Sequence, residues 1–495
     1  MGFLQGFEIA FQLENLVYCF VGVFVGTLVG VLPGIGPPAA MALLLPITYN
    51  MSALGAIIML AGIYYGAMYG GSTTSILVNI PGEAASVVTT LDGYQMAQHG
   101  RAGPALGIAA FASFIAGTIS VLGLTLIAGP LIQVALQFGP PEYFSLMALG
   151  LIILIHLTGG SVAKGFMMGL LGLLLSFVGL DTITGTPRFN FGMIQFMDGI
   201  GLVPLMMGLF GIGEVLTNLE RSEERGHIVT AGYKGLLPSV KDWKDAIGAI
   251  LRGSVVGFFL GVLPGGGATI SSFAAYGLER KISKHPEKFG KGAIEGVAAP
   301  EAANNAAVGG SMIPLLSLGI PTNGVIALLL GALIIHGLRP GPELLEKNPD
   351  IFWGFVASMY IGNGMLLVLN LPLIRFWVQI LKIPYRLLFP LILLFTIVGS
   401  YSIQNSLFDV KLMIFFGVVG YLLRKFNYEP SSLIMAFVLG PMLEEAFRQS
   451  LIISRGSFLI FISRPLSLTF LVLAAITALS SFTPIFRKHL QRIGG

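Results

Sequence analysis

Small uncharged polar side chains follow four sharp breaks in an otherwise apolar sequence. They are Ser72, Thr73, Asn79, Thr269, Thr322 and Asn323. A helix that ends inside a membrane leaves free amides at the start of the next segment, and these amides attract anions. The carbonyl groups that end the preceding segment can coordinate a cation. Each break could therefore supply both parts of a site that binds a cation together with an anion.

Glycines form the breaks themselves. Two breaks read Leu-Pro-Gly-x-Gly, at 32–36 and 263–267. The other two contain an Ile-Pro pair, at 79–82 and 319–322. Because glycine lets a backbone approach a ligand closely, we predict substrate binding by five glycines together with the six polar residues. The glycines are Gly34, Gly36, Gly265, Gly266 and Gly267. A single break reads more simply as a kink or a packing feature, whereas four in matching positions favour function.

Glu301 is the candidate residue for a coupling ion. It follows Pro300, and Asn304 and Asn305 come one turn later on nearly the same helix face. An ionisable group at membrane depth is by default a functional candidate, so we predict that these three residues bind a cation or carry a proton. The alternative, a helix cap near the cytoplasmic surface, stays open at this point because Lys291 is close in sequence.

Three other charged residues raise similar questions. Glu83 follows Pro81-Gly82 and poses the same question as Glu301. Arg101 and Arg339 each follow a His-Gly pair. Either arginine could bind a substrate carboxylate through its planar fork or anchor the chain at the membrane edge.

Catalytic motifs are absent from the sequence. It contains no His-Glu-x-x-His pair, no Gly-x-Ser-x-Gly turn and no Walker A loop. Cys19 is the single cysteine, which excludes an internal disulfide and a cysteine-ligated metal. We therefore expect no enzyme activity, no metal and no cofactor other than a coupling cation, Na+ or H+.

Composition indicates what must position these residues. The chain has 495 residues, of which 55% are hydrophobic and 11% charged, and its mean hydropathy is +0.84. These values predict an all-α polytopic membrane protein of about ten to twelve segments, some of them re-entrant, at roughly 20 residues per span. The net charge of +4 suits basic cytoplasmic loops and gives no reason to expect nucleic acid as a partner.

A duplication organises the chain. Glycine recurs at every fourth position from Gly22 and again from Gly253, and each series ends in Leu-Pro-Gly. We predict repeat units at about 16–105 and 247–342 within halves 1–218 and 247–495, joined by a polar cytoplasmic linker at 219–246. Basic residues flank the second unit's first hairpin and are missing beside the first one. That asymmetry predicts inverted repeats.

Four stretches resemble one known family. GVLPGIGPPAAMALLLPITY, YYGAMYGGSTTSILVNIPGE, GVLPGGGATISSFAAYGLERK and PEAANNAAVGGSMIPLLSLGIPTN are similar to the large membrane subunit of tripartite tricarboxylate transporters, the TctA family. The resemblance covers nearly the whole chain. It implies a multi-pass carrier for citrate or another tri- or dicarboxylate in a bacterial inner membrane, driven by an ion gradient. It also implies a small membrane subunit and a periplasmic substrate-binding protein as partners.

Two other functions remain open beside a symporter subunit. One is an intramembrane enzyme acting on a lipid-linked substrate. A metal requirement without transport would favour this function. The other is a channel or scaffold subunit, which saturable, gradient-dependent flux would exclude. The substrate, the coupling ion and whether the chain forms a homo-oligomer stay undetermined by the sequence.

Overall fold

The protein is a helical membrane protein. Our computed structural model describes residues 2–32, 35–157, 161–181, 183–220, 235–381, 383 and 385–480. In these residues the only strands are β1 (Gly179–Leu180) and β2 (Pro187–Arg188), which pair antiparallel. Six helices are long and apolar enough to cross a membrane, and six further apolar helices have 10–17 residues. The prediction of an all-α polytopic chain is confirmed.

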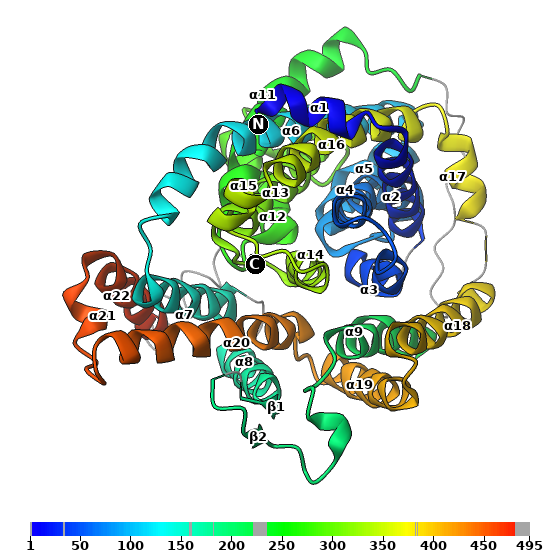
Figure 1. The fold of residues 1–495 in the computed structure, drawn as a ribbon. Helices are drawn as coiled ribbons and strands as arrows, with labels where there is room; N and C mark the ends of the chain where they lie inside the picture. Colours follow the sequence, from blue (N-terminus) through cyan, green and yellow to red (C-terminus); the bar gives the residue numbers. More distant parts are fainter. Residues whose placement is uncertain are drawn as a thin grey trace.

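Two series of helices, one from each half, form the core in Figure 1. The first series is α1 (Phe3–Ala10), α2 (Leu13–Val31), α3 (Pro37–Thr48), α4 (Ala53–Val78), η1 (Ala84–Ser86), α5 (Val87–Gln98) and α6 (Ala102–Ala135). The second is α11 (Val240–Val262), α12 (Gly267–Ile282), η4 (Pro286–Lys288), α13 (Glu295–Leu318), α14 (Gly324–Ile335), α15 (Pro342–Lys347), α16 (Pro349–Asn370) and α17 (Ile374–Ile380).

The glycine series form helix contacts that are alike in both halves. A Cβ atom at Gly22, Gly26 or Gly30 of α2 would overlap the carbonyl oxygens of Met59, Ile63 and Ala67 on α4, respectively. A Cβ at Gly253, Gly257 or Gly261 of α11 would likewise overlap those of Ala299, Ala303 and Ala307 on α13. In each pair the backbones therefore touch directly, as a face of small residues allows.

The breaks also have matching local structure. Asn79 ends α4 with φ 60°, and Gly319 ends α13 with φ 71°, so both helices stop at a left-handed residue. After the break, Glu83 caps η1 by accepting from the amide of Ala85, and Asn323 caps α14 by accepting from two amides. The two stretches thus repeat one backbone plan. Their relative direction across a membrane stays a prediction.

The remaining helices form two groups beside the core (Figure 1). One group is α7 (Pro140–Leu157), α8 (Val162–Ser176), α20 (Pro430–Ile453), α21 (Ile460–Ser463) and α22 (Pro465–Ser480). The other packs against α3 and comprises α9 (Leu202–Met206), the π-helix η3 (Met207–Ile212), α10 (Gly213–Glu220), α18 (Tyr385–Gln404) and α19 (Leu407–Lys425). A short 3₁₀ turn, η2 (Ile194–Phe196), precedes α9.

Two boundaries differ in detail from the sequence-based expectation. The apolar stretch 352–381 forms two helices, because Pro372 lies between α16 and α17 and has no amide to continue the helix. Within the expected linker 219–246, residues 221–234 lie outside the described part. The end of that stretch already belongs to α11, which begins at Val240 with a capping box between Ser239 and Asp242.

Candidate functional site

The helix breaks lie against one another. The Gly265 amide donates to the carbonyl oxygen of Thr322 at 2.7 Å, which joins the two breaks of the second half. In the first half, Gly82 packs so tightly on Gly30 that a Cβ there would overlap the Gly30 carbonyl oxygen. Asn323 Nδ2 also donates to the Tyr64 hydroxyl at 3.4 Å. A break of the second half therefore reaches α4 of the first.

A buried carboxylate lies where helices of both halves meet. Glu301 is fully buried on α13, and its Oε2 accepts from Ser72 Oγ of α4 at 2.5 Å. Its Oε1 accepts from Thr89 Oγ1 of α5, and Ser113 Oγ of α6 lies 3.5 Å from Oε2. One half of the chain thus supplies the carboxylate and the other supplies three hydroxyl groups.

The two asparagines predicted to act with Glu301 belong to the same cluster. Asn304 Nδ2 lies 3.5 Å from Glu301 Oε2. Asn305 Nδ2 donates to Ser113 Oγ at 2.8 Å and to the backbone oxygen of Glu301 at 3.0 Å. We call Ser72, Thr89, Ser113, Glu301, Asn304 and Asn305 the Glu301 cluster. Because α13 begins at Glu295, Glu301 lies inside the helix, so the open alternative of a terminal cap does not apply.

Charge balance sets what the cluster can do. Among the ion pairs of the described residues, none involves Glu301. A buried carboxylate without a counter-charge is costly by several kcal/mol. It is stable when a proton or a bound cation neutralises it. Carboxylate and hydroxyl oxygens are the ligands that hard cations prefer, so the arrangement suits a cation or a proton.

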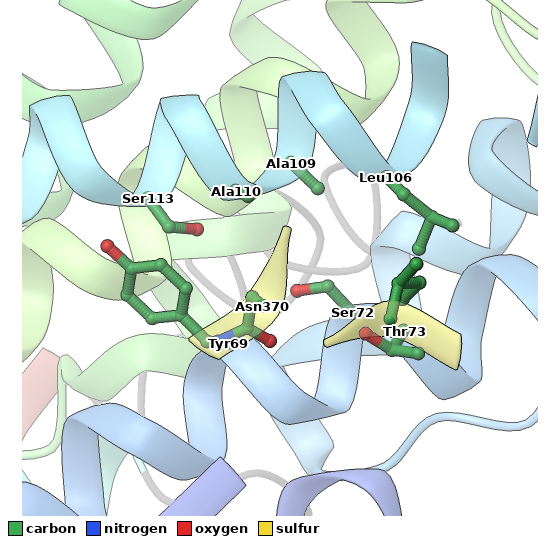
Figure 2. A pocket seen from close by; sticks show the side chains of 9 residues that line it. Tyr69, Ser72, Thr73, Leu106, Ala109, Ala110, Ser113 and Asn370 are labelled. Atoms are coloured by element: carbon green, nitrogen blue, oxygen red, sulfur yellow. The ribbon is translucent and has the colours of Figure 1, made fainter. Parts of the chain in front are cut away.

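Two small cavities adjoin the cluster. Figure 2 shows the first, where Tyr69, Ser72 and Thr73 of α4 face Ser113 of α6, with Asn370 beside them. Its volume is about 10 Å³. The second, of about 20 Å³, is lined in part by Asn305. Each volume is close to that needed for one water molecule. These cavities therefore have the size of a water or a small ion and are far too small for a tricarboxylate.

The other predicted binding residues are spread over the breaks. The Gly36 amide donates to Glu214 Oε1 of α10 at 2.7 Å, so a side-chain carboxylate already occupies the start of α3. Gly265 and Gly267 have φ of 80° and 43°, which favours glycine. A Cβ at Gly266 would overlap the Leu260 carbonyl oxygen, so the break itself requires that glycine.

Most of the other predicted residues remain separate from the cluster, and one falls outside the described chain. Thr269 is half-buried in the first turn of α12, Asn79 is exposed, and Thr322 is buried beside Gly265. Gly34 lies outside the described residues. The structure therefore brings the predicted site residues together in two places. One place holds Ser72, Thr73, Glu301, Asn304 and Asn305, and the other holds Gly265, Thr322 and Asn323.

The two candidate arginines differ in their surroundings. Arg101 forms an ion pair with Asp242, at the start of α11, with 2.5 Å between the charged atoms. Arg339 is exposed. No ion pair among the described residues joins either arginine to the Glu301 cluster, and Arg101 already has an internal carboxylate partner.

Several residues of this region were missed by the sequence-based analysis. Thr89 and Ser113 complete the Glu301 cluster from helices 212 and 188 residues away in sequence, a separation that no local pattern reveals. Asp92 accepts from the amides of Gly292 and Ala293, both at 2.8 Å, and thereby fixes the chain that leads into α13. No local pattern in the sequence singled it out.

Two relatives of this chain are known from Agrobacterium vitis. A protein of Agrobacterium vitis, described as an uncharacterized 52.8 kDa protein in the TAR-I ttuC' 3'region, is 50% identical over 99% of this chain and 97% of its own length. A second from the same organism, an uncharacterized protein in the TAR-II ttuC' 3'region, is 49% identical over 48% of this chain and 98% of its own length. No solved structure shows a significant match.

A family assignment follows from the extent of the match. The family described as the tripartite tricarboxylate transporter TctA family matches residues 16–435, which include both repeat units and the entire Glu301 cluster. This is a transporter family, in keeping with helix breaks and a buried carboxylate rather than with a catalytic motif. The chain belongs to the tripartite tricarboxylate transporter TctA family.

Proposed function

We propose that this chain is the large permease subunit of an ion-gradient-driven carboxylate uptake system, and that the Glu301 cluster binds its coupling cation, Na+ or H+. The observation that carries the proposal is the Glu301 carboxylate itself. It is fully buried, it has hydroxyl partners from three helices of the other half, and it has no ion-pair partner among the described residues. Loading and unloading a cation there would couple the two halves.

The substrate we propose is citrate or another tri- or dicarboxylate, bound near the breaks. Amides at the start of α12 would attract its negative charges, whereas the Asn323 side chain already accepts from two amides at the start of α14. Helix-end interactions contribute roughly 0.3–1 kcal/mol each, and about 2 kcal/mol when partly buried. Two or three of them give modest affinity for a multiply charged anion. A periplasmic binding protein that captures substrate tightly would remove that limit.

The remaining assembly follows from the family. A small membrane subunit and a periplasmic binding protein would complete the system, and its place would be a bacterial inner membrane. The TctA family assignment supports these partners. No feature of the described residues favours a catalytic function over transport.

Reconstitution tests the proposal. All three components are placed in proteoliposomes, and uptake of citrate, smaller dicarboxylates and aromatic acids is measured with Na+ and H+ gradients imposed separately. We expect saturable uptake that one gradient drives and that stops when it collapses. Little uptake should occur at low micromolar substrate without the binding protein. Full-rate uptake without that protein, or without any gradient, would contradict the proposal.

A further inference from the structure

A second buried carboxylate lies at the second break of the first half, outside the Glu301 cluster. Glu83 is 7% exposed. Its Oε2 accepts from the Ala85 amide at 2.5 Å, and this bond caps η1. Its Oε1 is buried and has no hydrogen-bond partner among the described residues. Half of the carboxylate is thus anchored, and the other half is free to bind a ligand.

Glu83 also lacks a counter-charge. None of the ion pairs of the described residues includes it. Glu83 and Glu301 are close enough to repel each other electrostatically. Two buried like charges destabilise the fold unless each is neutralised. A single cation held by the Glu301 cluster leaves Glu83 uncompensated.

The second break of the second half holds another buried oxygen atom without a partner. Thr322 Oγ1 is buried and likewise has no hydrogen-bond partner among the described residues. Its neighbour Asn323 contacts the Tyr64 hydroxyl, and Tyr64 interacts electrostatically with Glu83. The carbonyl groups that end α4 lie just before Glu83 in sequence, and carbonyls at such helix ends coordinate cations.

Gly71 of α4 packs closely against the Glu83 side chain. A Cβ at Gly71 would lie 2.9 Å from Glu83 Cγ and 3.3 Å from Oε1. A side chain at this position would therefore crowd Oε1.

We propose that Glu83 binds a second Na+ ion, separate from the cation at the Glu301 cluster. The proposal rests on the proposed function and extends it to two cations in each transport cycle. A bound ion is the missing partner of Glu83 Oε1 and neutralises its charge. Protonation would neutralise the charge too, but only a Na+ site makes uptake depend on the Na+ concentration through Glu83 at fixed pH.

The test is a Na+ titration of substrate uptake by the reconstituted three-component system at fixed pH. When the Glu301 cluster also binds Na+, two interacting sites predict a Hill coefficient of about 2, since the coefficient is bounded by the number of sites. Glu83→Gln keeps the shape and the cap acceptor but removes the charge, so its coefficient should then fall to about 1. When that cluster takes H+ instead, the wild-type coefficient is about 1 and Glu83→Gln should lose the Na+ dependence. Glu346→Gln, on an exposed residue, serves as the matched control and should behave like the wild type.

A second variant tests the same site with the carboxylate retained. Gly71→Ala crowds Oε1, and the Na+ concentration for half-maximal uptake should rise by about tenfold, equivalent to ~1.4 kcal/mol. Na+-dependent protection of the purified complex against thermal unfolding gives an independent reading of both variants. It should weaken in each.

Different outcomes separate this inference from the proposed function. A Hill coefficient in Glu83→Gln equal to that of the wild type overturns the second site and leaves the transport function intact. Activation by protons at constant Na+, without Na+ dependence, also overturns the Na+ site while the gradient-driven function stands. Uptake that responds to neither gradient overturns both.

Discussion

The two repeat units share a backbone plan and differ in their chemistry. In each unit a glycine face of the first helix packs on backbone carbonyls of a later helix, α2 on α4 and α11 on α13. Each later helix ends at a left-handed residue, Asn79 or Gly319. Such contacts depend on the lack of side chains, so both units retain glycine at the same places.

The polar residues do not follow this symmetry. Counted back from Asn79 and Gly319, Ala61 is the equivalent of Glu301, and Ser72 is the equivalent of Met312. All four side chains are buried. The second unit therefore contributes the carboxylate, and the first contributes a hydroxyl from a position that is apolar in the second. The two units therefore share the frame, whereas the polar residues of the candidate ion site differ between them.

The largest expected effect concerns the direction of the two units. Asn50→Cys and Lys284→Cys, each in a Cys19→Ser background, place a thiol in the equivalent exposed loops after α3 and α12. Cys19 is the single cysteine of the sequence, so its replacement by serine leaves no other thiol to compete for the reagent. An inverted repeat predicts that membrane-impermeant reagents label the two sites from opposite sides. Labelling from one side would mean a parallel duplication.

Substitution of equivalent glycines should damage both units alike. In Gly26→Leu and Gly257→Leu the new side chain meets the backbone of Ile63 and Ala303, respectively. Overpacking typically costs about 1–3 kcal/mol, and more where backbone must move. We expect both variants to give little folded protein by size-exclusion chromatography. If one were tolerated, the frame would be less symmetric than the contacts indicate.

A smaller effect is expected at the equivalent pair Ser72 and Met312. Ser72→Ala removes a hydroxyl partner of Glu301, and a hydrogen bond to a charged group contributes about 1.5–3 kcal/mol. The affinity for the coupling cation should therefore fall by roughly 10- to 100-fold. Met312→Leu is its control, because it conserves volume in a buried apolar position. Equal cation affinities in the two variants would contradict the proposal that Ser72, and not Met312, contributes to the cation site.

The smallest effect is expected where the two His-Gly turns differ. Arg101 pairs with Asp242 but is 44% exposed, and exposed pairs contribute about 0–1 kcal/mol. Arg101→Gln and Arg339→Gln should both transport with nearly wild-type KM. A large rise in KM for either variant, at unchanged thermal stability, would instead assign that arginine to substrate binding.

Local patterns in the sequence predicted the frame well, for a physical reason. Glycine spacing and Pro-Gly breaks are set by residues close together in sequence. The series Gly22 to Gly30 and Gly253 to Gly261 therefore predicted the helix faces that the structure confirms. Glu301, Asn304 and Asn305 could be grouped because they share one turn of α13.

The partners of Glu301 could not be found in this way. Thr89 and Ser113 are ordinary hydroxyl residues on helices far away in sequence. Such residues usually bond to their own helix backbone, as Thr118 does to Phe114. Only the packing of α5 and α6 on α13 distinguishes a hydroxyl that contacts Glu301 from one that bonds to its own helix backbone. The pairing of Gly36 with Glu214 is likewise a tertiary contact.

The most direct measurement is gradient-driven uptake by Glu301→Gln in the reconstituted three-component system. Glutamine has nearly the same shape, and its oxygen can accept from one of the two hydroxyls while its amide nitrogen donates to the other, so the complex should assemble normally. Without the charge, no cation is needed for neutralisation. We predict that uptake falls at least about 100-fold, or ~2.7 kcal/mol, and no longer responds to a Na+ or an H+ gradient. Uptake by Glu301→Gln at the wild-type rate that still rises with either gradient would contradict the assignment of Glu301 to the coupling cation.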